Sequence, residues 1–138
     1  MIFGIGTDLI EIERVEKACQ KEAFLTRTYT ERECRQTKRK ISMLAGNFAV
    51  KEAVAKAFGT GFRTFMPGDI EVLRDELGKP YVVLYGGAKE LADRAGITRI
   101  HVSITNTRDY AMAFATAECL EREEDHAVFT DRKTDEAG

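Results

Sequence analysis

Two side chains that could do chemistry lie four residues apart in one helical stretch of this sequence. Glu52 and Lys56 fall within NFAVKEAVAKAFGTG, residues 47–61, where most other residues are apolar or small. At about 100° per residue they lie roughly 40° apart, so they share one helix face. A helix that is apolar nearly all round is normally buried, and a buried charge must be paired, bind a metal or face a pocket. Alanines on the same side leave room for a ligand beside the carboxylate.

The simpler interpretation of these residues is an ion pair between Glu52 and Lys56, because acid–base pairs at this spacing are common on helices. Spacing alone leaves both interpretations open. The third charge of the stretch, Lys51, lies outside this pair. We expect its side chain to run along the apolar side of the helix and to carry its amine to water.

Asp8 is the second candidate carboxylate. The segment DLIE fits a capping box in which Asp8 is the N-cap and Glu11 follows three residues later. As an N-cap, Asp8 needs no other role. If it met Glu52 in space, the two carboxylates would form a Mg²⁺ site that substrate phosphates complete, and Lys56 would bind those phosphates. The nearby GIG and GTG segments match neither a dinucleotide fingerprint nor a Walker loop.

The elements that position these groups follow from periodicity and turn residues. The pattern predicts strands over 2–7, 100–105 and 110–119, and a hairpin over 70–85 that turns at ELGKP. It predicts helices from Asp8 to about Cys19, from the TERE capping box at 30–33 toward Lys40, from Ser42 to Phe58, and over 88–95 before Gly96. This order is typical of an α+β protein with helices packed on a small, mainly antiparallel sheet.

Length and composition indicate one globular domain. The chain has 138 residues, of which 43% are hydrophobic and 32% charged. We expect a domain over residues 1–120 and a charged, flexible tail over 121–138. No apolar run approaches the roughly 18 residues of a membrane span. The three cysteines lack CxxC spacing, which argues against a disulfide framework or a zinc site, so the cytoplasm is the expected location.

Charge is unevenly distributed along the chain, although its net value is only −2. Residues 14–40 hold nine Lys and Arg against four Glu, whereas residues 118–138 hold eight acids and three bases. The basic segment favours an acidic partner or phosphates, and a solvated helix surface explains it equally well. Nucleic acid is not expected, because no basic stripe is interleaved with aromatic residues.

Four segments in this order resemble the holo-acyl-carrier-protein synthases, the short class of 4′-phosphopantetheinyl transferases. They are GIGTDLIEIERV, FAVKEAVAKAFGTGFR, DELGKPYVVLYGGAKELA and HVSITNTRDYAMA, and the match covers about residues 2–120. The resemblance implies a 4′-phosphopantetheinyl-transferase-like fold. It also implies transfer of 4′-phosphopantetheine from coenzyme A to a serine of apo acyl carrier protein in fatty-acid biosynthesis. It also implies release of adenosine 3′,5′-bisphosphate, and a homotrimer with active sites at subunit boundaries.

The resemblance implies a role for individual residues as well. Asp8 and Glu52 would hold Mg²⁺. Glu52 and Lys56 would be the catalytic residues, and Lys56 would contact the pyrophosphate. Contacts with coenzyme A are implied for Lys56, Arg39, Asn47, Gly59, Gly61, Thr105 and Asn106. Lys38 and Lys40 would join Arg39 near the coenzyme's 3′-phosphate. Carrier protein would meet Arg14, Lys17, Lys21 and Arg27, with Phe24 as an apolar anchor.

Two positions depart from the family pattern. Many relatives carry Arg in place of Asn47 and His in place of Asn106, in regions associated with coenzyme A. These departures keep a second hypothesis open, a non-catalytic module that binds coenzyme A or carrier protein. A third is a Mg²⁺-dependent phosphate-ester hydrolase that uses the same carboxylates. Neither His101 nor His126 is a catalytic candidate, since the first alternates in a strand and the second lies in the tail.

Overall fold

The computed structural model describes residues 1–120, so the predicted tail over 121–138 lies outside the described residues. Its strands are β1 (Ile2–Glu11), β2 (Ile70–Arg74), β3 (Pro80–Leu84), β4 (Ile97–Asn106) and β5 (Tyr110–Cys119). Its α-helices are α1 (Ile12–Cys19), α2 (Glu22–Thr28), α3 (Glu31–Thr37), α4 (Ile41–Phe58) and α5 (Gly86–Ala95), with a short 3₁₀ helix at Pro67–Asp69. The predicted α+β class is confirmed.

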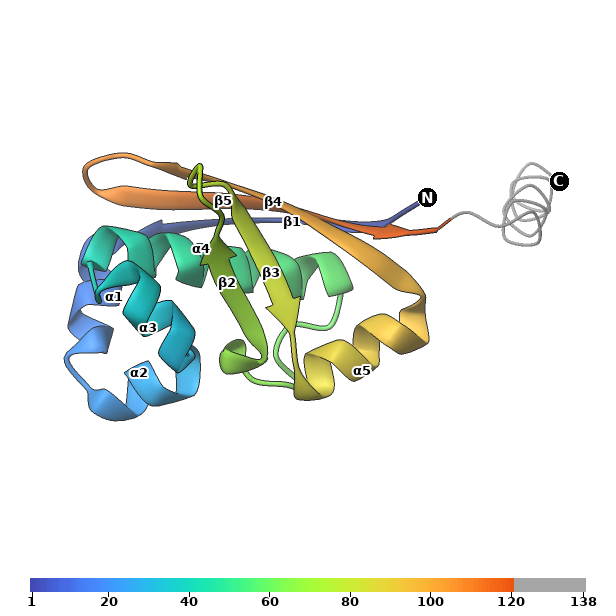
Figure 1. The fold of residues 1–138 in the computed structure, drawn as a ribbon, viewed down its shortest axis with the longest axis horizontal. Helices are drawn as coiled ribbons and strands as arrows, with labels where there is room; N and C mark the ends of the chain where they lie inside the picture. The colour runs from blue at the N-terminus through green and yellow to red at the C-terminus, as the bar shows by residue number, and fades with distance from the viewer. Residues whose placement is uncertain (121–138) are drawn as a thin grey trace, which may run out of the picture.

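A three-stranded antiparallel sheet in the order β1-β5-β4 forms one layer of the molecule. All the helices and the separate β2–β3 hairpin lie on one side of this sheet (Figure 1). Strand β5 alternates strictly, with its alanines at 111, 113, 115 and 117 fully buried under the helix layer. The alternation explains why this alanine-rich segment is a strand, because its small side chains allow α4 to lie close against the sheet.

Helix α4 is the central element of the helix layer, and it packs on both β1 and β5. Gly4 and Gly6 of β1 lie directly against its backbone, so an added Cβ would collide with the carbonyl groups of Ala57 and Ala53. The GIG sequence is therefore explained by close approach of a strand to a helix. Because side chains alternate along a strand, Asp8 points to the same side as these glycines.

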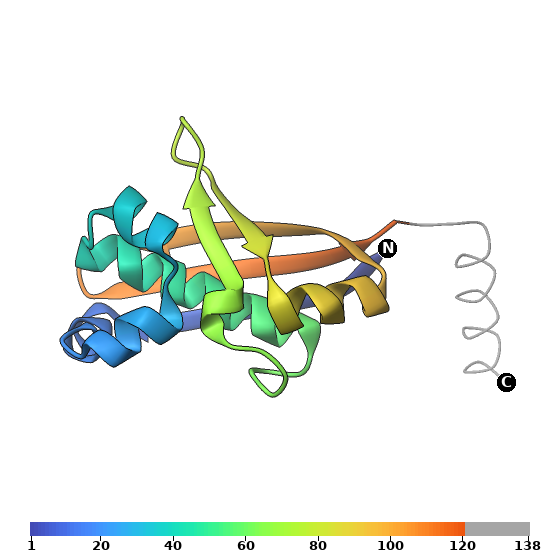
Figure 2. The same ribbon diagram turned by 60° about the horizontal axis from the view of Figure 1, so that its bottom comes forward.

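Around α4, the short helices and the hairpin complete the core. The Thr30–Glu33 capping box is present as predicted, and Gly59 ends α4 in the left-handed conformation. The hairpin projects beside α4, with α5 following it toward β4 (Figure 2). Its turn is held by Asp75, whose Oδ1 accepts from the backbone N–H groups of Leu77 and Lys79, both at 2.9 Å.

Two expectations for the first helix are wrong. Strand β1 continues to Glu11, because β5 pairs with it as far as Tyr110 opposite Glu11, so Asp8 lies within the strand and caps no helix. The helix begins at Ile12 with Glu11 as an N-cap that makes no side-chain hydrogen bond. A capping-box pattern beside a strand was the misleading signal. Helix α4 begins at Ile41, one residue before the predicted start.

Candidate active site

Asp8, Glu52 and Lys56 come together where β1 crosses α4. Asp8 projects from β1 toward the helix with its side chain 14% exposed, and Lys56 reaches over it from the last turn of α4. Lys56 Nζ donates to the carbonyl oxygen of Thr7 at 3.0 Å and lies 3.5 Å from Asp8 Oδ1. Within residues 1–120, Lys56 pairs with Asp8 and makes no ion pair with Glu52, so the simple pair along the helix does not form.

One oxygen of Asp8 is left without a partner. Asp8 Oδ2 is buried and accepts no hydrogen bond from the described part of the chain. A buried polar atom without a partner costs about 1–3 kcal/mol, so native structures seldom leave one unless a bound group supplies the missing contact. Its neighbours in this position are a second carboxylate, Glu52, and a lysine.

Burial acts on both carboxylates, and repulsion from Asp8 acts on Glu52 as well. Burial raises the pKa of Asp8 above its ordinary value, and the ammonium of Lys56 opposes the rise. Burial also raises the pKa of Glu52, and repulsion from Asp8 adds to it against the opposing effect of Lys56. A single lysine does not compensate two carboxylates in this position, so the pair attracts a further cation.

The two carboxylates fit a Mg²⁺ ion that protein and substrate oxygens coordinate together. Mg²⁺ prefers oxygen ligands, and it commonly uses one or two carboxylates together with substrate phosphates. Among the described residues, no group of three or more acids, histidines or cysteines could enclose a metal without such help. The orphaned Oδ2 of Asp8 is the observation that matches this chemistry most directly.

The residues predicted to contact coenzyme A lie in several places. Gly59 and Gly61 follow α4, both in left-handed conformations, close to Lys56 in the chain. Arg39 is exposed, and its Nη2 lies 3.6 Å from Glu22 Oε1. Thr105 and Asn106 are exposed at the end of β4, where Asn106 Nδ2 donates to the carbonyl of Ser42. Their coenzyme contacts stay predictions.

Asn47 lies inside the protein, with 1% of its surface exposed. Its Nδ2 donates to Glu33 Oε2 and to the carbonyl of Val72, each at 3.2 Å, and its Oδ1 accepts from Arg74 Nη2 at 3.1 Å. The amide is thus engaged on both ends within the chain.

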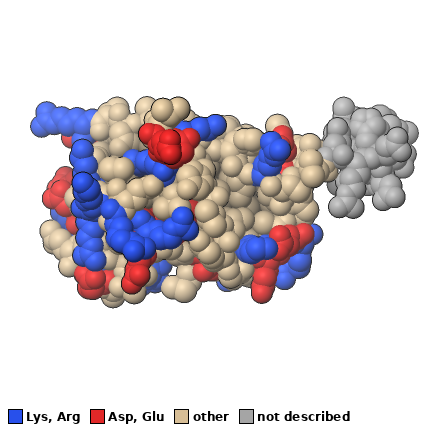
Figure 3. Space-filling model, viewed as in Figure 1, with Lys and Arg blue, Asp and Glu red and all other residues tan. Residues whose placement is uncertain are grey.

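The predicted carrier-binding residues lie on or beside α1 and α2, which contact each other. Arg14 and Lys17 of α1 are exposed, as are Lys21 and Arg27 around α2. Phe24 is half-buried, and its ring packs against those of Tyr29 and Phe48. Further lysine and arginine side chains gather over the helices at the left of the molecule (Figure 3). The four basic side chains are thus accessible, whereas most of the Phe24 ring lies within the helix layer.

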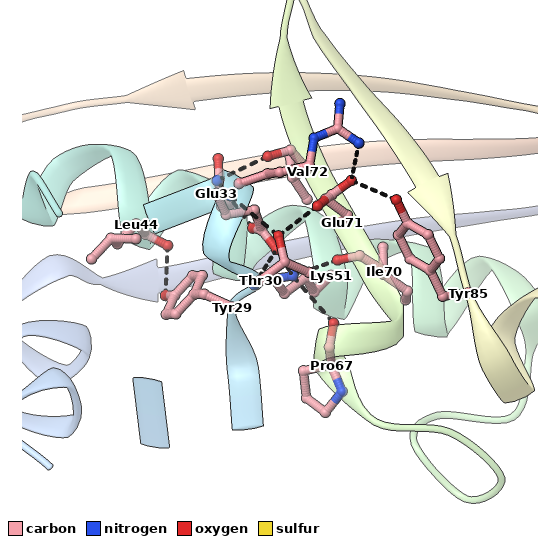
Figure 4. A network of polar contacts seen from close by, with 12 residues as sticks. Tyr29, Thr30, Glu33, Leu44, Lys51, Pro67, Ile70, Glu71, Val72 and Tyr85 are labelled. Carbon is pink, nitrogen blue, oxygen red and sulfur yellow. Dashed lines mark hydrogen bonds and ion pairs between the residues drawn. The ribbon is translucent and has the colours of Figure 1, made fainter. Parts of the chain in front are cut away.

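Lys51 does not reach water, so the expectation for this side chain is wrong. It is fully buried and forms an ion pair with Glu33, with Lys51 Nζ 2.7 Å from Glu33 Oε1 (Figure 4). It also donates to the carbonyl groups of Pro67 and Ile70. All its N–H groups are thus satisfied, as burial of an ammonium requires. The sequence showed Glu33 only as a capping residue, and its second role depends on α3 lying across α4.

A second buried acid in the same region, Glu71, escaped the sequence analysis. It accepts from Thr30 Oγ1 at 2.6 Å, from Tyr85 Oη at 2.9 Å and from Arg32 Nη1 at 3.2 Å (Figure 4). An acid within the apolar run IEVL was the available signal. Together with Lys51 and Glu33, it connects α3, α4 and β2 through polar contacts in the core.

No helix in the described part of the chain is both long and apolar enough to cross a membrane.

Comparisons with known proteins identify the family of this chain. Residues 4–115 match the family model of the 4′-phosphopantetheinyl transferase superfamily. Holo-[acyl-carrier-protein] synthase of Lachnoclostridium phytofermentans is 58% identical over 120 residues, which are 87% of this chain and 98% of that protein. The synthase of Clostridium novyi is 47% identical over 122 residues, which are 86% of this chain and 88% of that protein.

Solved structures show the same fold. The holo-[acyl-carrier-protein] synthase of Neisseria meningitidis has a TM-score of 0.78 at 34% identity, covering 86% of this chain and 99% of that one. The Helicobacter pylori synthase, solved in complex with coenzyme A, has a TM-score of 0.74 at 32% identity, covering 83% and 99%. The chain described above, with its two carboxylates between β1 and α4, therefore belongs to the 4′-phosphopantetheinyl transferase superfamily, alongside the holo-[acyl-carrier-protein] synthases.

Proposed function

We propose that this protein is a holo-[acyl-carrier-protein] synthase, which transfers 4′-phosphopantetheine from coenzyme A to a serine of apo acyl carrier protein. The family membership supports the reaction class, since the relatives carry this name at up to 58% identity. The observation that carries the assignment to a site is the buried, unpartnered Oδ2 of Asp8 beside Glu52 and Lys56. Because its substrates are coenzyme A and a fatty-acid carrier protein, we place the reaction in the cytoplasm.

In this proposal Asp8 and Glu52 hold Mg²⁺, which neutralises charge on the pyrophosphate of coenzyme A when it is bound. Lys56 provides a fixed positive charge on the same phosphates. The serine oxygen bonds to the β-phosphorus, and the bond from that phosphorus to the bridging oxygen breaks. Adenosine 3′,5′-bisphosphate leaves with the bridging oxygen, and the serine proton passes to a basic group at the carboxylate pair.

We also propose that the protein assembles as a homotrimer through the outer face of its large sheet. Apolar side chains of β1 and β5 are exposed there, including Ile5 at 59%, Leu9 at 64%, Met112 at 41% and Phe114 at 38%. No described element covers this face (Figure 1). A contiguous exposed apolar face on a folded protein commonly marks an interface, and further copies of this chain are the partner that the family resemblance favours.

The function is tested by mixing the protein with Mg²⁺, coenzyme A and apo acyl carrier protein, and then weighing the carrier by mass spectrometry. We expect a gain of one phosphopantetheine arm, and a rate at least about 100-fold lower for Glu52→Gln. Glu90→Gln, on the exposed side of α5, is the matched control and keeps the parent rate.

Two results would contradict the proposal. Binding of coenzyme A without transfer to any apo carrier would favour a binding module. Release of nucleotide from coenzyme A with water alone, at a rate that carrier protein does not change, would indicate a hydrolase.

A further inference from the structure

Arg74 is a half-buried cation without an acidic partner. It ends β2, and its guanidinium makes one side-chain hydrogen bond, from Nη2 to the neutral Oδ1 of Asn47 at 3.1 Å. Among residues 1–120, no carboxylate forms an ion pair with it. Burial lowers the pKa of this arginine from its ordinary value, and no neighbouring acid opposes that effect. A guanidinium in such a position lacks the counter-ion that partly buried charges normally have.

Three acids near Arg74 in the chain or in the network are engaged elsewhere. Asp75, the next residue, accepts the two backbone N–H groups of the hairpin turn. Glu71, on the same strand, accepts from three other side chains, and Glu33 is held by Lys51. The missing counter-ion of Arg74 is therefore a consequence of how the whole network is connected.

The position of Arg74 is set from two directions. Gln36 of α3 forms a reciprocal pair with its backbone, in which the Arg74 N–H donates to Gln36 Oε1 at 2.7 Å and Gln36 Nε2 donates to the Arg74 carbonyl at 2.8 Å. Asn47 uses its Nδ2 on Glu33 and Val72, which turns its Oδ1 toward the guanidinium. The series of hydrogen bonds from Lys51 through Glu33 and Asn47 thus holds Arg74 in place. The buried network therefore positions a cation as well as stabilising the core.

Gly46 of α4 provides the space for the guanidinium. A Cβ on Gly46 would lie 3.2 Å from Arg74 Nη2 and 3.2 Å from Ile104 Cγ2 of β4. Glycine inside a helix costs roughly 1 kcal/mol relative to alanine, so a helix carries it where close approach needs it. Arg74 therefore lies between α4 and β4, close to the start of α4.

The segment that follows α3 in the chain is basic. Three successive bases, Lys38, Arg39 and Lys40, connect α3 to α4 and are exposed. The first turn of α4 contains no acidic residue. A fixed guanidinium with unused N–H groups, on a strand that α3 contacts just before this basic segment, has the chemistry that binds a phosphate group.

We infer that Arg74 binds the 3′-phosphate of coenzyme A, and that Asn47 and Gly46 position it for this contact. The inference rests on the proposed function, which supplies coenzyme A as substrate. Asn47 and Glu52 are five residues apart, about 140° around the helix, so Arg74 and the carboxylate pair lie on different flanks of α4. Lys56 belongs to the flank of the reacting pyrophosphate. The phosphate remote from the reacting bond, on the 3′ position of the ribose, is the one left for Arg74.

The test compares binding of coenzyme A and 3′-dephospho-coenzyme A by isothermal titration calorimetry in the presence of Mg²⁺. For Arg74→Gln we expect about 10- to 100-fold weaker binding of coenzyme A, because a hydrogen bond between two charged groups is lost. Binding of the dephospho compound should not change. Arg94→Gln, which removes the same charge from exposed α5, is the matched control and should leave both affinities unchanged.

A second variant keeps the test valid if Arg74→Gln loosens the hairpin. Gly46→Ala leaves Arg74 in the chain but crowds its guanidinium, so it should weaken binding of coenzyme A and spare the dephospho compound. Equal losses for the two compounds in both variants, or no loss in either, would overturn the inference and leave the proposed function intact. A parent protein that binds neither compound would instead refute the proposed function.

Discussion

Asp8 and Glu52 project from a strand and a helix toward the same lysine, and burial raises the pKa of both carboxyl groups. Asp8 also destabilises the charged form of Glu52. Such an arrangement lowers the stability of the metal-free protein, and functional sites often carry this kind of cost. Removing one charge should therefore stabilise the fold while it removes activity.

We expect Glu52→Gln to unfold at a higher temperature than the parent in the absence of Mg²⁺, by an amount that depends on pH. The pKa of Glu52 in the folded state lies above its ordinary value of 4.5, so folding binds a proton, and stability falls as pH rises through that interval. The two proteins should unfold alike below that ordinary value, and the advantage of the variant should grow toward neutral pH.

Calorimetric melts across this pH range, in a chelating buffer, would measure the effect. Glu90→Gln provides the control, because this side chain is exposed on α5. A stability difference that is the same at every pH would show that repulsion at Glu52 is not its cause.

At the scale of elements, α4 carries polar side chains on two different sides. Glu52 and Lys56 face β1, whereas Asn47 and Lys51 face α3 and the start of the hairpin. The buried pair of Lys51 and Glu33 joins α4 to α3. Breaking such a pair is costly, because the remaining charge stays in the core without compensation.

We predict that Lys51→Met lowers the free energy of unfolding by about 3–5 kcal/mol, because it leaves Glu33 buried and unpaired. The double variant Lys51→Met/Glu33→Gln should recover part of this loss, since it removes the stranded charge. Urea unfolding followed by circular dichroism would measure both changes. Lys89→Met is the control, because it breaks an exposed pair with Asp93 on α5, and its effect should not exceed about 0.5 kcal/mol. Similar losses for Lys51→Met and Lys89→Met would contradict this account of the pair.

At the scale of the whole molecule, the sheet has one face under α4 and one face without cover by any described element (Figure 1). Strands β1 and β5 present large apolar side chains on the uncovered face, and β4 presents polar ones there, at His101, Ser103 and Thr105. Sheets that face water on one side usually alternate apolar with polar residues. The departure from that rule over β1 and β5 marks the part of the face that we expect other copies to bury.

We expect light scattering after gel filtration to give the mass of three chains for the parent protein and of one chain for Ile5→Glu/Phe114→Glu. Placing charges on the apolar face opposes association, because they would be buried without partners. If the active sites lie at subunit boundaries, the monomeric variant also loses transferase activity. Met66→Glu provides the control, since Met66 is 50% exposed but lies outside the large sheet. A charged variant that keeps the trimer mass would refute this interface.

Much of the secondary structure could be read from local pattern. The hairpin at residues 70–85, the Thr30 capping box and the glycine stop of α4 depend on neighbours in the sequence, and each is present. The spacing of Glu52 and Lys56 also predicted that both lie on one side of α4, and in the structure both lie near Asp8. Local interactions determine these features, so local sequence predicts them.

The sequence could not determine which residues form ion pairs and hydrogen bonds with one another. Asp8 appeared as a helix cap because its following residues suit one, yet pairing with β5 extends the strand through it. Lys51 and Asn47 could be assigned only after α3 and β2 were seen to meet α4. The partners Glu33, Val72 and Arg74 are distant in sequence, and only the folded chain brings them within hydrogen-bond range. By itself the sequence thus determined most of the elements and the reactive residue types. The tertiary structure decided which charges pair in the core and which, like one oxygen of Asp8, have no partner in the described part of the chain.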